Sequence, residues 1–76
     1  MTVKVYSTPT CIWCTRAKEY FQQNNIEYVE YDVSVDRDKA MEMVDKSGQR
    51  GVPVIDIEGN IIVGFDQEKI NELLGL

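Results

Sequence analysis

The sequence predicts one small α/β domain spanning residues 1–76, in which three helices cover a four-stranded mixed sheet. Three observations support this fold class. The chain is 76 residues long, which leaves room for a single hydrophobic core. Its apolar residues alternate in some segments and recur at helical spacing in others. Helix caps and turn residues separate these segments and give the order β-α-β-α-β-β-α.

The first half of the chain is predicted to form a strand, a helix and a second strand. Residues 2–6 alternate around two valines, and residues 26–33 are rich in Val, Tyr and Ile. Between them, residues 12–24 form a helix whose start is capped by Thr10 or by Cys11 itself. Its apolar face consists of Trp13, Ala17, Tyr20 and Phe21. A helix of this length between two strands forms a right-handed unit with parallel strands.

The second half is predicted to contain a helix, a β-hairpin and a final helix. The first of these helices covers residues 36–47 and ends at Gly48. Short strands at residues 54–57 and 60–63 flank a Glu-Gly-Asn turn, which indicates an antiparallel pair. The last helix covers about residues 67–74. This order of elements is the minimal architecture of the thioredoxin superfamily, so a thioredoxin-like fold is expected.

Composition and charge argue against several classes of function. The net charge is −5 and the eight basic residues form no run, so nucleic acid is not an expected ligand. The longest apolar runs are far shorter than the ~20 residues of a membrane span, so no membrane association is expected. The N-terminus lacks the features of a secretory signal, which favours a cytoplasmic protein. A monomer is expected, because the predicted elements account for the apolar faces.

Two cysteines, Cys11 and Cys14, carry the chemistry that the sequence indicates. They lie three positions apart where the first helix begins, so their side chains are within reach of a disulfide bond. The free N–H groups and the dipole of a helix start stabilise a thiolate at Cys11, and the thiolate is the nucleophilic form. The chain contains no histidine, which excludes a Cys-His hydrolase and zinc sites that use imidazole.

These features predict a thiol–disulfide oxidoreductase without a metal. Cys11 attacks a substrate disulfide, and Cys14, one turn into the helix, resolves the mixed disulfide. Two other interpretations stay open from the residues alone. The two thiolates could hold zinc or an iron–sulfur cluster shared across a dimer, or both thiols could be buried and inert.

Two loop segments are candidates for binding a substrate beside the cysteines. Pro53 either simply begins the third strand or faces the cysteine pair in its cis form, with the Val52 backbone turned outward to a substrate peptide. Gly64, Phe65 and Asp66 precede the last helix, where they turn the chain, pack against it and cap it. Free N–H groups at this helix start can also bind a carboxylate of a ligand.

Two further side chains are candidates at the same site. Trp13 lies between the cysteines and is either part of the core or an exposed contact for a partner. Arg50 is the basic residue beside the predicted substrate loop, where its guanidinium could meet a carboxylate. The alternative for Arg50 is an ordinary surface position.

The combined pattern resembles the glutaredoxin family over nearly the whole chain. The segments that carry the resemblance are Cys11-Ile12-Trp13-Cys14, Gly51-Val52-Pro53 and Gly64-Phe65-Asp66. The resemblance implies that Cys11 is the nucleophile, that Cys14 resolves and that Pro53 is cis. It also implies that the Val52 backbone and the turn at residues 64–66 hold glutathione as a co-substrate, with no tightly bound cofactor.

Three departures from the usual glutaredoxin pattern bear on the reductant. Thr8 stands where the family usually has a lysine that helps bind a glutathione carboxylate. Ile12 and Trp13 replace Pro-Tyr between the cysteines, and Val63 replaces the first glycine of a pair. These differences resemble the NrdH-redoxin branch, which takes electrons from thioredoxin reductase and gives them to ribonucleotide reductase, although the Trp-Ser-Gly-Phe-Arg stretch of that branch is not present. The resemblance implies protein disulfide partners, with glutathione or thioredoxin reductase as the reductant.

Overall fold

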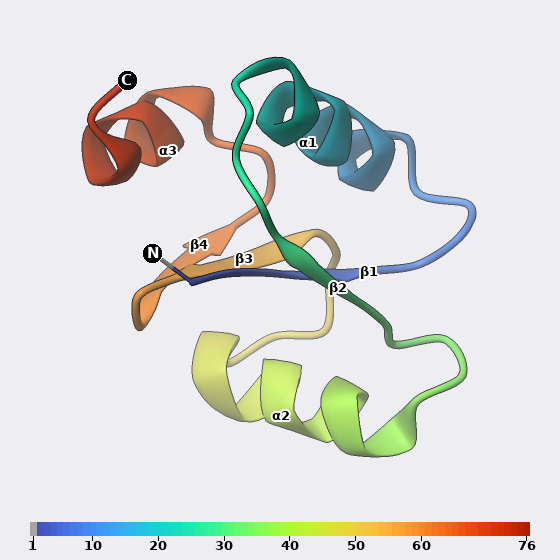
Figure 1. Cartoon of the computed structure of the whole chain (residues 1–76). Helices are drawn as coiled ribbons and strands as arrows, with labels where there is room; N and C mark the ends of the chain where they lie inside the picture. The colour runs from blue at the N-terminus through green and yellow to red at the C-terminus, as the bar shows by residue number, and fades with distance from the viewer. Residues whose placement is uncertain (1) are drawn as a thin grey trace.

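The computed structural model describes residues 2–76 and contains the predicted elements in the predicted order (Figure 1). Their bounds are β1 Val3–Ser7, α1 Ile12–Gln23, β2 Val29–Asp32, α2 Arg37–Ser47, β3 Val54–Ile57, β4 Asn60–Val63 and α3 Gln67–Leu74. Within the described part of the chain, none of the helices has the length and apolar character needed to cross a membrane.

The four strands form one mixed sheet in the order β2-β1-β3-β4. β1 is parallel to β2 and antiparallel to β3, and β4 is the antiparallel neighbour of β3. In this register Tyr6 lies between Tyr31 and Val54. The end of β1, where the cysteine loop begins, therefore lies next to the start of β3, which Pro53 precedes.

Helices cover both faces of the sheet. Figure 1 shows α1 and α3 on one face and α2 on the other. Buried apolar side chains fill the space between the sheet, α1 and α3. They are Val3, Val5, Ala17, Phe21, Ile55, Ile57, Ile62 and Ile70. On the α2 face, Tyr6, Met43 and Val54 form a smaller cluster near an ion pair in which Lys46 Nζ lies 2.8 Å from Asp56 Oδ2.

The ends of α2 and α3 follow the predicted capping chemistry. The Asp36 and Asp66 side chains accept hydrogen bonds from the backbone N–H groups of Lys39 and Lys69, at 3.1 and 3.2 Å. Each aspartate thereby satisfies a donor that has no partner within its helix. Gly48 ends α2 with a φ of 72°, a left-handed conformation that glycine adopts without strain.

The second strand is shorter than predicted. Residues 26–33 were expected to be extended and paired, but only Val29–Asp32 forms β2. The Ile26 N–H group donates a 2.8 Å hydrogen bond to the Phe21 carbonyl at the end of α1, so it is not available to the sheet. Because Ile26 is bonded to the end of α1, the strand begins later in the chain, at Val29.

The buried face of α1 also differs from the expected one. Trp13 was placed on the apolar face, but it is 55% exposed. The residues of α1 that are buried are Cys14, Ala17 and Phe21. Their spacing of three and four positions defines one stripe of the helix, and position 13 is rotated away from it. Trp13 is therefore not part of the core, and its contact with a partner stays a prediction.

Candidate active site

Cys11 and Cys14 lie where the loop after β1 enters α1. Cys11 is the N-cap residue, and its Sγ accepts a hydrogen bond from the Cys14 N–H group at 3.1 Å. This contact selects Cys11 over Thr10 as the cap of the helix. An N–H donor and the positive end of the helix dipole both stabilise negative charge on the Cys11 sulfur. Both cysteines are free thiols.

The two thiols have different surroundings. Cys11 is partly exposed, whereas Cys14 is 0% exposed. Burial, followed by the hydrogen bond with Cys11, raises the pKa of Cys14 to about 12. A backbone hydrogen bond from Thr8 and the positive charge of Lys18 act in the opposite direction. Cys14 is therefore a protonated thiol at neutral pH, and Cys11 is the sulfur that a partner can reach.

Thr8 contacts the cysteine loop through its backbone. Its carbonyl accepts a hydrogen bond from the Cys11 N–H group at 3.3 Å, and its backbone also lowers the pKa of Cys14. The Thr8 side chain is half-buried and carries no charge. Thr8 thus lies beside the pair, as expected, but it cannot replace the cation of a lysine at this position.

The Val52–Pro53 peptide bond is cis, as the family resemblance implied. Pro53 is buried and Val52 is half-buried. The Pro53 carbonyl accepts a hydrogen bond from the Gly64 N–H group at 2.8 Å. This bond joins the loop before β3 to the turn before α3, so the two predicted substrate segments lie side by side.

A groove of about 350 Å³, called the aromatic groove below, lies between α1 and the start of α3. It is lined by Trp13, Arg16, Glu19, Tyr20, Gln23, Phe65 and Gln67. The Arg16 guanidinium lies 5.2 Å from the centroid of the Trp13 ring. Tyr20 packs edge-on against Phe65, with ring centroids 5.7 Å apart. Trp13 and Phe65, which were singled out separately, therefore share one surface.

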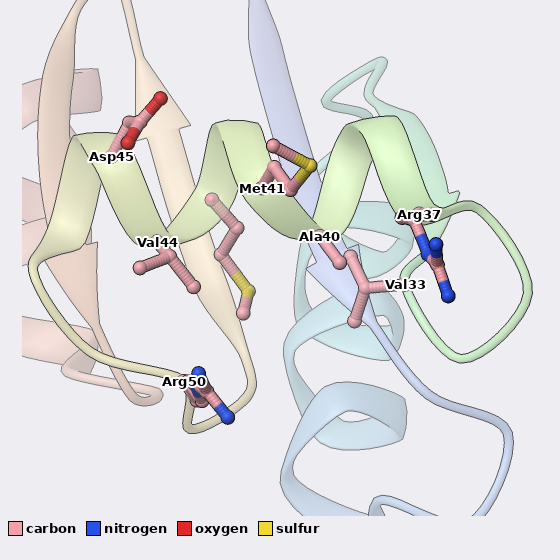
Figure 2. A pocket seen from close by; sticks show the side chains of 8 residues that line it. Val33, Arg37, Ala40, Met41, Val44, Asp45 and Arg50 are labelled. Carbon is pink, nitrogen blue, oxygen red and sulfur yellow. The ribbon is translucent and has the colours of Figure 1, made fainter.

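A second groove, the α2 groove, has a volume of about 740 Å³ and lies on the other side of the sheet (Figure 2). It is lined by Val33, Arg37, Ala40, Met41, Met43, Val44, Asp45 and Arg50. Figure 2 shows the side chains of Val33, Arg37 and Arg50 on the same side of α2. Arg50 is thus away from the aromatic groove. Arg37 was not among the candidate residues of the sequence analysis. The feature that could have indicated it is a basic residue directly after the capping Asp36.

The described residues contain no cluster of side chains suited to bind a metal ion. Among residues 2–76, no group of three or more His, Cys, Asp or Glu side chains is placed to hold a metal ion. A metal held by Cys11 and Cys14 would therefore need its other ligands from outside the His, Cys, Asp and Glu side chains of these residues.

Comparison with known proteins identifies the family. A sequence model of the glutaredoxins matches residues 3–62 of the chain. This chain belongs to the glutaredoxin family. Membership of the glutaredoxin family, together with the thioredoxin-like fold, supports a thiol–disulfide oxidoreductase.

Relatives cover most of this glutaredoxin-family chain. A Clostridium pasteurianum protein, described as an uncharacterized glutaredoxin-like 8.6 kDa protein in the rubredoxin operon, is 50% identical over 72 residues, which are 95% of this chain and 96% of that protein. Glutaredoxin 3 of Escherichia coli K12 is 33% identical over 64 residues, 84% of this chain and 77% of its own length. The crystal structure of a mutant of the thioredoxin-like protein BC3987 matches with a TM-score of 0.91 and 32% identity, covering 96% of this chain and 94% of that one.

Proposed function

We propose that this member of the glutaredoxin family reduces protein or mixed disulfides with Cys11 and Cys14 as its redox pair. The proposal rests on the difference in solvent exposure between the two cysteines. Cys11 is partly exposed and its Sγ lies 3.1 Å from the Cys14 nitrogen, whereas Cys14 is buried. An accessible sulfur beside an N–H donor suits nucleophilic attack, and a buried thiol one turn further on suits resolution.

The reaction consists of two thiol–disulfide exchanges. The Cys11 thiolate attacks one sulfur of the substrate disulfide, a Cys11–substrate bond forms, and the other substrate sulfur leaves as a thiolate. Cys14 then loses its proton and attacks the Cys11 sulfur. The Cys11–Cys14 disulfide forms and the second substrate sulfur leaves as a thiolate. The substrate gains the two electrons that the cysteine pair loses, and its thiolates take up protons.

We assign the loop and groove beside Cys11 and the α2 groove, on the other side of the sheet, to binding of substrate and glutathione. We infer that the backbone of Val52, before the cis Pro53, pairs with an extended peptide; the hydrogen bond from Gly64 to Pro53, which joins this loop to the turn before α3, supports a shared surface. Trp13 and Phe65 offer apolar contacts in the aromatic groove. Arg50 offers a guanidinium for a carboxylate in the α2 groove. No tightly bound cofactor is required, because the electrons pass directly between sulfur atoms.

Two reductants are compatible with these surfaces. Arg37 and Arg50 in the α2 groove favour glutathione, since guanidinium groups bind carboxylates in a bidentate manner. Thr8, in place of the usual lysine, favours thioredoxin reductase and a protein target such as ribonucleotide reductase.

With either reductant, the cysteine pair must start as free thiols, so we propose that the chain works in a reducing compartment such as the cytoplasm. That the protein is a monomer stays a prediction.

The reductant is tested by offering the oxidised protein two electron sources. One is glutathione with glutathione reductase, and the other is thioredoxin reductase, each with NADPH, whose oxidation is followed. If glutathione is the reductant, Arg50→Ala should raise the KM for glutathione about tenfold, because a charge-assisted contact is lost. Turnover only with thioredoxin reductase would contradict the glutathione assignment.

The roles of the two cysteines are tested by single substitutions. Cys11→Ser should abolish turnover, since it removes the attacking sulfur. Cys14→Ser should leave the first exchange intact and accumulate a covalent adduct at Cys11, which intact-protein mass spectrometry detects. Loss of turnover in Cys14→Ser without an adduct would contradict the assigned roles.

A further inference from the structure

A polar cluster lies between α1 and the β1–β2 edge of the sheet. Oε2 of Glu30, on β2, accepts hydrogen bonds from the Ser7 hydroxyl at 2.7 Å and from the Lys18 ammonium at 2.6 Å. Ser7 ends β1 and is 1% exposed. The Glu30 carboxylate therefore joins three elements at one point and holds the Lys18 side chain against the sheet.

Lys18 is positioned to act on Cys14. The two residues are one helical turn apart, at i and i+4, so their side chains lie on the same face of α1. The Lys18 side chain is 23% exposed and Cys14 is 0% exposed, so water screens their interaction only in part. Burial raises the pKa of Cys14, and the Lys18 charge counteracts part of this increase.

Few other charged or polar groups act on the Cys14 thiol. Cys11 faces it from the start of the helix and raises its pKa, while the Thr8 backbone lowers it. Within the described residues, Lys18 is the cation acting on this sulfur. Further ionisable groups around Lys18 and Glu30 are Tyr28 and Asp32. The Thr8 backbone and the Lys18 ammonium thus both favour the anionic form of Cys14, and Lys18 is the one of the two that carries a charge.

We propose that Lys18, held in place by Glu30, is a positioning residue for the second exchange, in which its ammonium stabilises the Cys14 thiolate. This role rests on the redox function proposed above. In that step Cys14 gives its proton to solvent, its sulfur attacks the Cys11 sulfur, and the substrate sulfur leaves as a thiolate that takes up a proton. Lys18 keeps its own proton, because the hydrogen bond to Glu30 raises the pKa of the ammonium. It contributes charge and transfers no proton.

Single-turnover oxidation by 2,2′-dithiodipyridine separates the two exchanges. This neutral disulfide releases one thiopyridone when Cys11 attacks, at a rate that depends on reagent concentration, and a second when Cys14 resolves, at a rate that does not. Lys18→Met should slow the second release about threefold to tenfold between about pH 6 and 8 and change the first less than about twofold. Lys18→Arg, which keeps the charge, should stay within about twofold of the wild type in both steps.

Lys39→Met is the matched control. Lys39 also forms a partly exposed ion pair, with Glu42 at 3.2 Å, but on α2. This variant should leave both releases unchanged, and circular dichroism verifies the fold of each variant at the assay temperature. Equal second-step rates in Lys18→Met and the wild type, or equal slowing by Lys18→Met and Lys18→Arg, would overturn the role of the charge. A wild type without a second release would instead refute the proposed redox function.

Discussion

The two cysteines are one helical turn apart but differ in solvent exposure: Cys11 is partly exposed and Cys14 is buried. Cys11 uses its sulfur as the N-cap of α1, a position that serine or aspartate usually occupies. The cap and the proposed nucleophile are therefore the same atom. Because serine also caps helices well, Cys11→Ser should remove the redox chemistry while the start of α1 is retained.

Alkylation distinguishes the two thiols. In the reduced native protein near pH 7, iodoacetamide should modify Cys11 alone, because Cys14 is buried and has a raised pKa of about 12. Peptide mass spectrometry locates the modified residue, and protein unfolded in denaturant should be modified at both positions. Equal native modification of Cys11 and Cys14 would contradict the asymmetry on which the proposed roles depend.

Among the elements, α2 is attached to the sheet as much by polar contacts as by apolar ones. Met43 is its buried residue. The Tyr6 hydroxyl, which lies at the sheet, donates a hydrogen bond to Glu42 at 2.7 Å, and Lys46 donates to Tyr6 and to Asp56 at 3.1 and 2.8 Å. Because α2 also lines the groove that contains Arg50, the start and orientation of this helix bear on ligand binding.

The N-cap of α2 gives a prediction at the level of the element. Asp36→Ala should lower the free energy of unfolding by about 1 kcal/mol, since the Lys39 N–H group loses its acceptor. Asp36→Asn keeps an acceptor oxygen and should cost less than about 0.5 kcal/mol. Urea denaturation measures both variants. A loss in Asp36→Asn as large as that in Asp36→Ala would show that the carboxylate charge, and not the cap, is what matters.

Considered as a whole, the molecule has a sheet with two unlike faces. The face towards α1 and α3 is covered by aliphatic and aromatic side chains, and the face towards α2 carries the buried carboxylate of Asp56. Asp56 also accepts a 2.8 Å hydrogen bond from the Gly59 N–H group in the β3–β4 turn. One carboxylate thus ties the hairpin to Lys46 of α2, so its protonation affects the global stability.

Acid should destabilise the fold through Asp56. Burial alone would raise the pKa of Asp56, but the hydrogen bonds from Lys46 and Gly59 lower it below its ordinary value overall. A lowered folded-state pKa gives stability that is present above the unfolded pKa of about 3.9 and is lost as pH falls through the folded value. The free energy of unfolding should therefore fall below about pH 4.

Asp56→Asn tests this assignment. At pH 7 the variant should lose about 1–3 kcal/mol, because Lys46 loses its charged partner. Its stability should also fall less steeply than that of the wild type between about pH 4 and pH 2. Urea denaturation at a series of pH values measures both effects. Parallel pH profiles for the two proteins would assign the acid sensitivity to other carboxylates.

The sequence by itself determined the order of the elements, the helix caps and the position of the proposed redox pair. Asp36, Gly48 and Asp66 act within their own helices, and the cysteines lie one turn apart, so these features depend on residues that are close in the chain. Local hydrogen bonds and hydrophobic periodicity are sufficient to predict such features.

Only the tertiary structure decided how the segments meet around the pair. The exposure of Trp13, the shortening of β2 and the presence of Arg37 and Arg50 in one groove depend on which surfaces the sheet and helices cover. The same holds for the contact between Lys18 and Glu30. The burial that raises the pKa of Cys14, like the pairing of Lys18 with Glu30, depends on segments that become adjacent only after folding, so no local pattern encodes it.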